Sequence, residues 1–501
     1  MTADREIELK LEVSPEDAAG VAAWIERKGQ VRPNQQLRST YFDTTKKALR
    51  TAGISLRVRR AGEHKFIQTE KLAGESAGLF SRAEWEWEIE GEKPDRSLLD
   101  GTPAAAALGG AKLVPLFLTD VKRSIWIIKG PDGLIEVALD RGRLEAGERE
   151  VPLCELELEL KQGHERALFD YARELAASVP VRLAALSKAD RGFALAEGRL
   201  GAVTKAAPVF VASAMAVRDG FAIIVHACLK HFLLNDEPLA RWRDAGALHQ
   251  ARVALRRLRS ALALFRPALV DDHFESIRSE LRWFSGQLGE ARNLDVMIEM
   301  RVAAGDESGA IDLRAAREEA YGSVIAALGS RRFRDVMLDL VRWIEIGKWR
   351  SRSKAQKPLQ PFAIKRLDRL WRRVTASGDD PATLGEEPRH RLRIEIKKLR
   401  YASEFLAGLF PDKPAEMKAF GQDLQTIQDS LGHLNDIATA RALAIDPDLA
   451  DQIRAAAEAR NEEKYLRLSR KALRRLIRTG PFWRDDCLNG LGLRPELARQ
   501  V

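Results

Sequence analysis

The opening strand of the chain carries alternating charged residues that could bind a metal ion and an anion. Glu6, Glu8 and Lys10 alternate with Ile7 and Leu9, and successive side chains of a β-strand point to opposite faces. Two carboxylates on one face suit a hard divalent cation, and the lysine beside them suits an anion. An isolated pattern of this kind is also typical of a solvated strand face, so its repetition elsewhere decides between the two interpretations.

Further segments repeat this alternation and sort their charges into acidic and basic sets. Segments 54–59, 65–71, 82–90, 123–128, 134–140 and 155–161 place apolar residues on one face and ionised residues on the other. The ionised residues include Arg57, Arg59, Lys71, Arg82, Arg123, Asp140, Glu155, Glu157 and Glu159. A solvated face would contain more neutral polar side chains, whereas a barrel built from these strands would gather the charges inside a tunnel.

The two kinds of charge have different uses in such a tunnel. Guanidinium groups bind phosphate oxygens through two parallel hydrogen bonds. Carboxylates approach a phosphate chain without repulsion when a divalent cation lies between them, which indicates Mg²⁺ or Mn²⁺. The strands therefore predict a metal-assisted binding site for a polyanion.

The chain after residue 213 has the apolar period of amphipathic helices and predicts an all-α bundle. Residues 201–213 lose the strand pattern, include Pro208 and predict a linker. The net charge of +9 belongs to the helical part, because residues 1–200 carry nearly equal numbers of acidic and basic side chains. This surplus predicts a polyanionic partner.

The helical part contains an internal repeat of basic residues. One copy is His249, Arg252, Arg256 and Arg259, and the other is His390, Arg393, Lys397 and Arg400. Each set lies on one stripe of a helix and is followed by a Leu-Gly pair, Leu288-Gly289 or Leu431-Gly432, which we interpret as a turn. Like charges on one stripe repel each other, so two matching copies favour a cationic groove over a solvated face. These cations are not interleaved with aromatic residues, which disfavours nucleic acid as the ligand.

Composition excludes several other classes. Apolar runs are too short to cross a membrane, and the first residues are acidic where a signal peptide would have a basic segment. We therefore expect a cytoplasmic protein without a membrane partner. The three cysteines are too dispersed for a disulfide framework or a zinc site.

The ordered set of charged strands over residues 4–198, together with Ser187 to Gly192, resembles the CYTH domain of triphosphate tunnel metalloenzymes. This superfamily contains triphosphatases, thiamine triphosphatases and adenylyl cyclases. The resemblance implies an eight-stranded antiparallel tunnel with flanking helices over residues 1–200. Glu70 stands where the family more often has an apolar residue, and we expect it to affect the tunnel rim.

The resemblance also implies roles for individual residues. Phosphate binding is implied for Lys10, Arg57, Arg59, Lys71, Arg82, Arg123 and Lys188. Metal binding is implied for Glu6, Glu8, Glu157 and Glu159, with Asp140 and Glu155 in support, and catalysis for Glu6, Glu8, Lys10 and Lys71.

Residues 214–501 resemble the CHAD domain, a helical module associated with inorganic polyphosphate. The resemblance implies that His249, Arg252, Arg256, Arg259, His390, Arg393, Lys397 and Arg400 bind polyphosphate. Asn293 departs from the family pattern, and we interpret Asp295 and Asp436 as partners that orient arginines.

The α+β chain is thus predicted to hydrolyse inorganic triphosphate with Mg²⁺ or Mn²⁺ and to bind polyphosphate, with association with polyphosphate granules. One alternative is a non-catalytic polyphosphate-binding protein that targets granules. Another is a tunnel enzyme for an organic triphosphate, such as a nucleotide or thiamine triphosphate, or an adenylyl cyclase.

Overall fold

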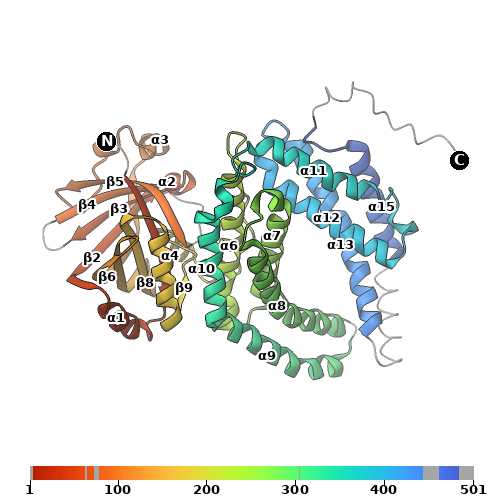
Figure 1. The fold of residues 1–501 in the computed structure, drawn as a ribbon, viewed down its shortest axis with the longest axis horizontal. Coiled ribbons are helices and arrows are strands. Elements are labelled where there is room, and N and C mark those ends of the chain that lie inside the picture. The colour runs from red at the N-terminus through yellow and green to blue at the C-terminus, as the bar shows by residue number, and fades with distance from the viewer. Residues whose placement is uncertain (1–3, 62–64, 73–77, 304, 444–461, 485–501) are drawn as a thin grey trace.

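The chain folds into a β-barrel followed by an all-helical region (Figure 1), as predicted. The computed structural model describes residues 4–61, 65–72, 78–303, 305–443 and 462–484. Within these ranges only the backbone is described for residues 4–6, 79–82 and 435–443. The side chains of Glu6, Arg82 and Asp436 therefore lie outside the described part of the structure.

The barrel sheet has nine antiparallel strands in the described residues, one more than the eight predicted. They are β1 (Asp4–Val13), β2 (Gln30–Thr44), β3 (Ile54–Ala61), β4 (Lys65–Leu72), β5 (Leu79–Ile89), β6 (Leu113–Gly130), β7 (Gly133–Ala146), β8 (Arg149–Gly163) and β9 (Val181–Leu183). Strands β1 to β8 form a closed ring, because β1 pairs with both β5 and β8. The ninth strand, β9, pairs with the end of β1 beyond β5. Its three residues are too few to show a period in the sequence.

Helices cover the outer face of the ring. Helices α1 (Ala18–Glu26) and α4 (Arg166–Ser178) pack on the outward side chains of β1 and β8, among them Leu9, Leu11 and Leu158. Helices α2 (Ala48–Thr51) and α3 (Pro103–Leu108) cover Leu56 and Val58 of β3. The apolar half of each alternating strand therefore faces helices, and the charged half faces the interior.

Helix α5 (Lys188–Ala196) packs against the inner face of the ring instead. Its residues Phe193 and Leu195 form a buried cluster with Tyr41, Phe117 and other inward residues of β2, β6, β7 and β8. An apolar segment inside the barrel was not predicted from the sequence.

Glu70 lies on the outer face of β4 and not at the tunnel rim. Its side chain is buried and accepts a hydrogen bond from the backbone N–H of Ala104 at 3.0 Å. Thr102, which precedes α3, makes no side-chain capping bond of its own. The expected effect on the rim is therefore wrong, because Glu70 supplies the missing acceptor at the start of α3.

The helical region confirms the predicted all-α part. Its described helices are α6 (Val217–Trp242), α7 (Ala245–Leu269), α8 (Phe274–Ala303), α9 (Glu307–Gly329), α10 (Arg331–Ile346), α11 (Leu359–Thr375), α12 (Glu386–Leu406), α13 (Pro414–Leu443) and α15 (Glu462–Thr479). The two Leu-Gly pairs were interpreted as turns, which is wrong: Gly289 lies inside α8 and Gly432 inside α13. Residues 444–461, between α13 and α15, lie outside the described ranges.

The barrel and the helical region share one hydrophobic core. Helix α10 packs against α4 and β9 of the barrel (Figure 1), and apolar residues of both parts belong to one buried cluster. Ion pairs flank this contact, with Arg342 of α10 2.7 Å from Asp170 of α4. The buried carboxylate of Asp236 on α6 pairs with Arg182 of β9. The two parts therefore meet through a packed interface.

The predicted linker, residues 201–213, forms no regular helix or strand but packs on the helical region. Val209 and Val211 are buried. The backbone of Thr204 donates to Asn235 Oδ1 at 3.0 Å and accepts from Asn235 Nδ2 at 2.8 Å, so the segment is fastened to α6.

Candidate active site and anion-binding surface

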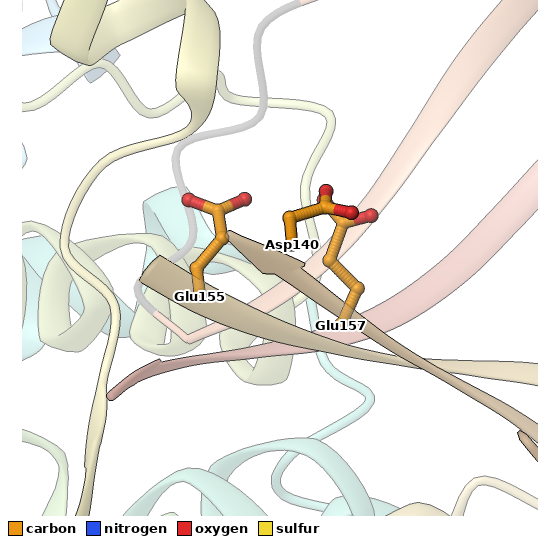
Figure 2. Close-up of side chains that lie close together, drawn as sticks. All are labelled: Asp140, Glu155 and Glu157. Atoms are coloured by element: carbon orange, nitrogen blue, oxygen red, sulfur yellow. The ribbon is translucent and has the colours of Figure 1, made fainter. Parts of the chain in front are cut away.

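Three carboxylates meet on the inner face of the barrel (Figure 2). Asp140 comes from β7, and Glu155 and Glu157 come from β8, whose antiparallel register places Glu155 opposite Asp140. One oxygen atom of each carboxylate lies within 4.8 Å of the others. Because Asp140 and Glu155 are also buried, the group requires neighbouring cations to remain ionised.

Three cations surround this carboxylate cluster. Arg123 of β6 donates to the two oxygens of Asp140 at 2.8 and 2.7 Å and to Glu157 at 2.5 Å. Lys188, the first residue of α5, contacts Asp140 at 2.7 Å and Glu157 at 3.0 Å and also bonds to Glu155. Lys10 of β1 bonds to Glu157 and lies 2.9 Å from Glu8. The β1, β6, β7, β8 and α5 elements thus supply one connected charge network.

The network keeps Asp140 and Lys188 charged despite burial. Burial alone would raise the pKa of Asp140, but the charges of Lys188 and Arg123 lower it to about 2. Burial alone would likewise lower the pKa of Lys188, but the Asp140 and Glu155 carboxylates raise it. The charged forms therefore persist at neutral pH.

The opposite wall of the ring is basic. Arg57 and Arg59 project inward from β3, and the Arg59 guanidinium donates to Ser39 Oγ at 3.3 Å. Burial lowers the pKa of Arg59 to about 10, and the charges of Arg57 and Arg123 contribute to the shift. No described carboxylate forms an ion pair with Arg59. A partly buried guanidinium beside other cations is an arrangement that an anionic ligand would stabilise.

The remaining predicted residues lie around these two groups. Lys71 of β4 is 2.9 Å from Glu84 of β5, which also lies 3.9 Å from Arg57. Glu159 pairs with Lys161 at 2.6 Å and is partly exposed, so it lies outside the three-carboxylate cluster. Glu84 was not among the predicted site residues, although the alternation of β5 places it on the same face as Arg82.

The carboxylate cluster fits a hard divalent cation. Asp140, Glu155 and Glu157 each offer an anionic oxygen, the ligand type that Mg²⁺ and Mn²⁺ prefer. With Glu8, four carboxylates face three cations, so the surroundings retain a negative balance that a metal ion would offset. A metal held here would share its carboxylates with Arg123 and Lys188.

A cationic cavity lies between the two repeat helices and α8. It has a volume of about 390 Å³ and lies against three of the predicted residues, Arg256 and Arg259 of α7 and Lys397 of α12. Arg278 and Arg282 of α8 and Lys398 of α12 line it as well and were not predicted. Burial lowers the pKa of Arg259, and the charges of Arg282 and Arg278 contribute. The two α8 arginines are spaced four residues apart, so they lie on one face of the helix. This spacing is visible in the sequence, but the two residues lie outside the repeated motif and were not assigned to the groove.

The other predicted cations of the repeat have different surroundings. Burial lowers the pKa of Arg252 to about 10, with contributions from the charges of Arg256 and Arg292. Arg400 donates to Glu404 at 2.7 Å and to Gln428 at 3.0 Å. Burial lowers the pKa of His249, and the nearby arginines contribute, so this imidazole is neutral at neutral pH. The predicted set therefore spreads over a surface wider than the cavity.

Each glycine of the two Leu-Gly pairs faces an arginine of the repeat. A Cβ atom at Gly289 would lie 3.2 Å from Arg252 Nη1, and one at Gly432 would lie 3.7 Å from the guanidinium of Arg393. The same pairing occurs in both halves, which supports the duplication. Gly289 thus lets Arg252 lie close to the backbone of α8, whereas the distance at Gly432 is that of an ordinary van der Waals contact.

Family models match both parts of the chain. The CYTH domain model matches residues 4–193, and the CHAD domain model matches residues 223–445. The chain is a CYTH–CHAD protein. The charge network lies in the CYTH domain, and the cationic cavity lies in the CHAD domain.

The chain is 33% identical over 194 residues to an inorganic triphosphatase of Haemophilus influenzae. The matched region covers 38% of this chain and 55% of the relative. The chain therefore spans about half the length of the curated relative that it matches. Among solved structures, the CHAD domain of the plant Ricinus communis is 24% identical and covers 56% of this chain and 98% of its own, with a TM-score of 0.48. A candidate adenylyl cyclase from Hippeastrum with a dominant triphosphatase activity is 22% identical and covers 39% of this chain and 97% of its own, with a TM-score of 0.30.

None of the helices in the described residues combines the length and apolarity needed to cross a membrane.

Proposed function

We propose that the CYTH domain hydrolyses inorganic triphosphate with the assistance of Mg²⁺ or Mn²⁺. The observation that carries the proposal is the division of one barrel interior into a carboxylate cluster and a wall of partly buried arginines. The relative named inorganic triphosphatase supports the same activity.

The residues of the chain have separable tasks in this reaction. Arg57 and Arg59 bind phosphate oxygens and neutralise their charge, which stabilises the transferring group. Arg123 and Lys188 fix the positions of the carboxylates that would hold the metal, namely Asp140, Glu155 and Glu157. Glu8 is linked to them through Lys10, and Glu6 and Glu159 remain predicted ligands. The metal, when bound, supplies Lewis-acid polarisation of the phosphoryl oxygens.

The first experiment measures phosphate release from triphosphate, ATP, thiamine triphosphate and long polyphosphate with Mg²⁺ or Mn²⁺. We expect triphosphate to be the best substrate and Glu157→Gln to reduce kcat by about 100-fold or more, because the variant loses a charge in the cluster. Glu150→Gln is the matched control, since Glu150 lies on the same strand and is exposed. Absence of metal-dependent release from every substrate would favour the non-catalytic alternative, and faster turnover of ATP or thiamine triphosphate would favour an organic substrate.

We also propose that the CHAD domain binds inorganic polyphosphate along the surface that contains the cationic cavity. The support is the concentration of Arg256, Arg259, Arg278, Arg282 and Lys397 around one volume that would accommodate a flexible polyanion. Such binding would also bring the protein to polyphosphate granules.

Charge reversal tests this second proposal. Arg256→Glu/Arg259→Glu should weaken polyphosphate binding by about 2 kcal/mol or more, or roughly 30-fold, while triphosphate hydrolysis persists. Arg266→Glu/Arg314→Glu makes the same change in net charge at two exposed positions of the helical region and should have a smaller effect. Equal losses in the two double variants would show that net charge, and not the cavity, governs binding.

A further inference from the structure

One row of side chains crosses the sheet from its edge strand to the carboxylate cluster. Residues directly opposite each other on antiparallel strands project to the same face of a sheet. Arg182 of β9 is opposite Glu12 of β1, and Glu12 is in turn opposite Glu155 of β8. Glu155 is opposite Asp140 of β7, which is opposite Arg123 of β6. The row therefore contains two members of the carboxylate cluster and has an arginine at each end.

The middle of this row consists of three carboxylates on neighbouring strands. Like charges that lie directly opposite each other in a sheet repel, so Glu12 and Glu155 need cations beside them. Arg191 of α5 lies 3.2 Å from Glu12. Burial raises the pKa of Glu12, the charges of Arg191 and Arg182 oppose the shift, and those of Glu237 and Glu155 reinforce it. Glu12 is therefore the electrostatic link between the edge strand and the carboxylate cluster.

Arg182 is held from the side of the helical region. The carboxylate of Asp236 on α6 pairs with it and is only 1% exposed. The charge of Asp236 raises the pKa of Arg182 although burial opposes this, and the charge of Glu12 contributes. Asp236 belongs to the CHAD domain, whereas Arg182 and Glu12 belong to the CYTH domain. A residue of one domain thus neutralises the arginine that ends a row of site residues in the other.

A second ion pair at the same interface provides a comparison. Arg342 of α10 and Asp170 of α4 lie 2.7 Å apart, and their side chains are 32% and 42% exposed. Asp170 lies on a helix of the outer face of the ring, so the barrel wall separates this pair from the carboxylate cluster. The Arg182–Asp236 pair differs from it because its arginine continues into the row of inward side chains.

We propose that Asp236 is a positioning residue of the candidate metal site and acts on it from the CHAD domain through Arg182 and Glu12. The inference rests on the proposed metal-assisted function of the CYTH domain. Asp236 cancels much of the charge of Arg182 and holds its guanidinium at the domain interface. The row therefore keeps the negative surplus that a divalent cation offsets. Its consequence is that the docked CHAD domain sets the metal affinity of the CYTH domain.

The two partners of the ion pair should change metal affinity in opposite directions. Asp236→Asn leaves the charge of Arg182 uncompensated beside the row, and we expect Mn²⁺ affinity to fall by about threefold, as for one unit charge at roughly 10 Å. Arg182→Met removes that charge and should raise the affinity by a similar factor. Arg182→Met/Asp236→Asn should bind Mn²⁺ nearly as the wild type does. Glu12→Gln removes a negative charge from beside Glu155 and should lower the affinity.

The test measures Mn²⁺ binding to the full-length protein without substrate, from the loss of the EPR signal of the free ion. Triphosphate hydrolysis at varied Mn²⁺ is the second readout, and the half-saturating Mn²⁺ concentration should shift with the affinity. Arg342→Met and Asp170→Asn are the matched controls, because they make the same changes at the other ion pair of the interface. Both should retain the Mn²⁺ affinity of the wild type. Urea unfolding shows that each variant is folded under the assay conditions.

Lower Mn²⁺ affinity in both Asp236→Asn and Arg182→Met, or no change in either, would overturn the inference, because a pair that only holds the domains together affects both variants alike. If Asp236→Asn does not fold, Arg182→Lys takes its place. It keeps the charge and should keep the wild-type affinity, and an increase equal to that of Arg182→Met would overturn the inference. Failure of the wild type to hydrolyse triphosphate would contradict the proposed hydrolysis alone, whereas absence of Mn²⁺ binding would overturn both proposals.

Discussion

At the scale of single residues, burial lowers the pKa of two cations of the barrel, but their neighbouring charges act in opposite directions. Lys188 is surrounded by carboxylates that raise its pKa. Burial lowers the pKa of Arg59 to about 10, with Arg57 and Arg123 contributing. Lys188 therefore stabilises the ligand-free protein, whereas Arg59 is held in an unfavourable position that an anion would relieve.

This difference gives a prediction with two readouts. Arg59→Met should stabilise the ligand-free protein by about 1 kcal/mol, because it removes a buried charge from beside other guanidinium groups. The same variant should raise KM for triphosphate. Thermal unfolding without ligand and initial-rate kinetics measure the two effects, and the exposed neighbour Arg60→Met serves as the control. If Arg59→Met lowers stability and leaves KM unchanged, Arg59 does not bind the phosphate chain.

The types and faces of the site residues could be predicted from the sequence because ionised residues at alternate positions have few uses outside a charged interior. The grouping could not be predicted, because it depends on which strands are neighbours in the ring. Asp140 joins Glu155 and Glu157 through the β7–β8 register, whereas Glu159, in the same sequence pattern, pairs with Lys161. Alternation places a side chain on a face and leaves its partners unspecified.

At the scale of elements, α8 uses a glycine in mid-helix, Gly289, to accommodate Arg252 of the preceding repeat helix. Glycine is unfavourable in a helix interior by about 1 kcal/mol relative to alanine. The glycine therefore lowers helix stability but allows a guanidinium group to lie close to the backbone.

Two substitutions on α8 test these two effects of glycine. Gly286→Ala should stabilise α8, since a Cβ atom there meets nothing within 4 Å. Gly289→Ala should weaken polyphosphate binding, because its methyl group displaces the Arg252 guanidinium from its present position. Isothermal titration and thermal unfolding of both variants separate the effects. The same loss of affinity in both would attribute the change to the helix and not to Arg252.

The elements that sequence analysis missed share a physical cause. The period of a segment shows that it has two unlike faces, but not what each face meets. Lys188 was predicted as a site residue, but the helix that begins there, α5, was not, and its apolar face packs inside the ring. The Leu-Gly pairs have the composition of a helix end, yet both lie inside continuous helices.

At the scale of the whole molecule, the interface between the CYTH and CHAD domains includes one buried carboxylate. Burial raises the pKa of Asp236, and Arg182 opposes this shift. A buried charge that loses its partner is strongly unfavourable, whereas replacing both partners by apolar groups is often tolerated.

A double-mutant cycle tests this interface. Arg182→Met should destabilise the protein by about 2 kcal/mol, because Asp236 would remain buried without its cation. Arg182→Met/Asp236→Leu should recover most of the loss. Urea unfolding of the two single variants and the double variant provides the coupling energy. Additive effects of the two substitutions would show that the pair does not contribute to holding the domains together.

The position of β1 in the ring has a consequence for how the chain reaches its fold. This N-terminal strand pairs with β5, β8 and β9, so its last partner, Val181–Leu183, is synthesised long after it. The barrel cannot close while β8 is still within the ribosome, and pairing over such sequence separations slows folding. During synthesis, the edge of β1 that pairs with β8 and β9 therefore stays without its partners until most of the CYTH domain has emerged. The charged residues of β1 that contribute to the folded site also keep the incompletely paired strand soluble and disfavour its pairing with other chains.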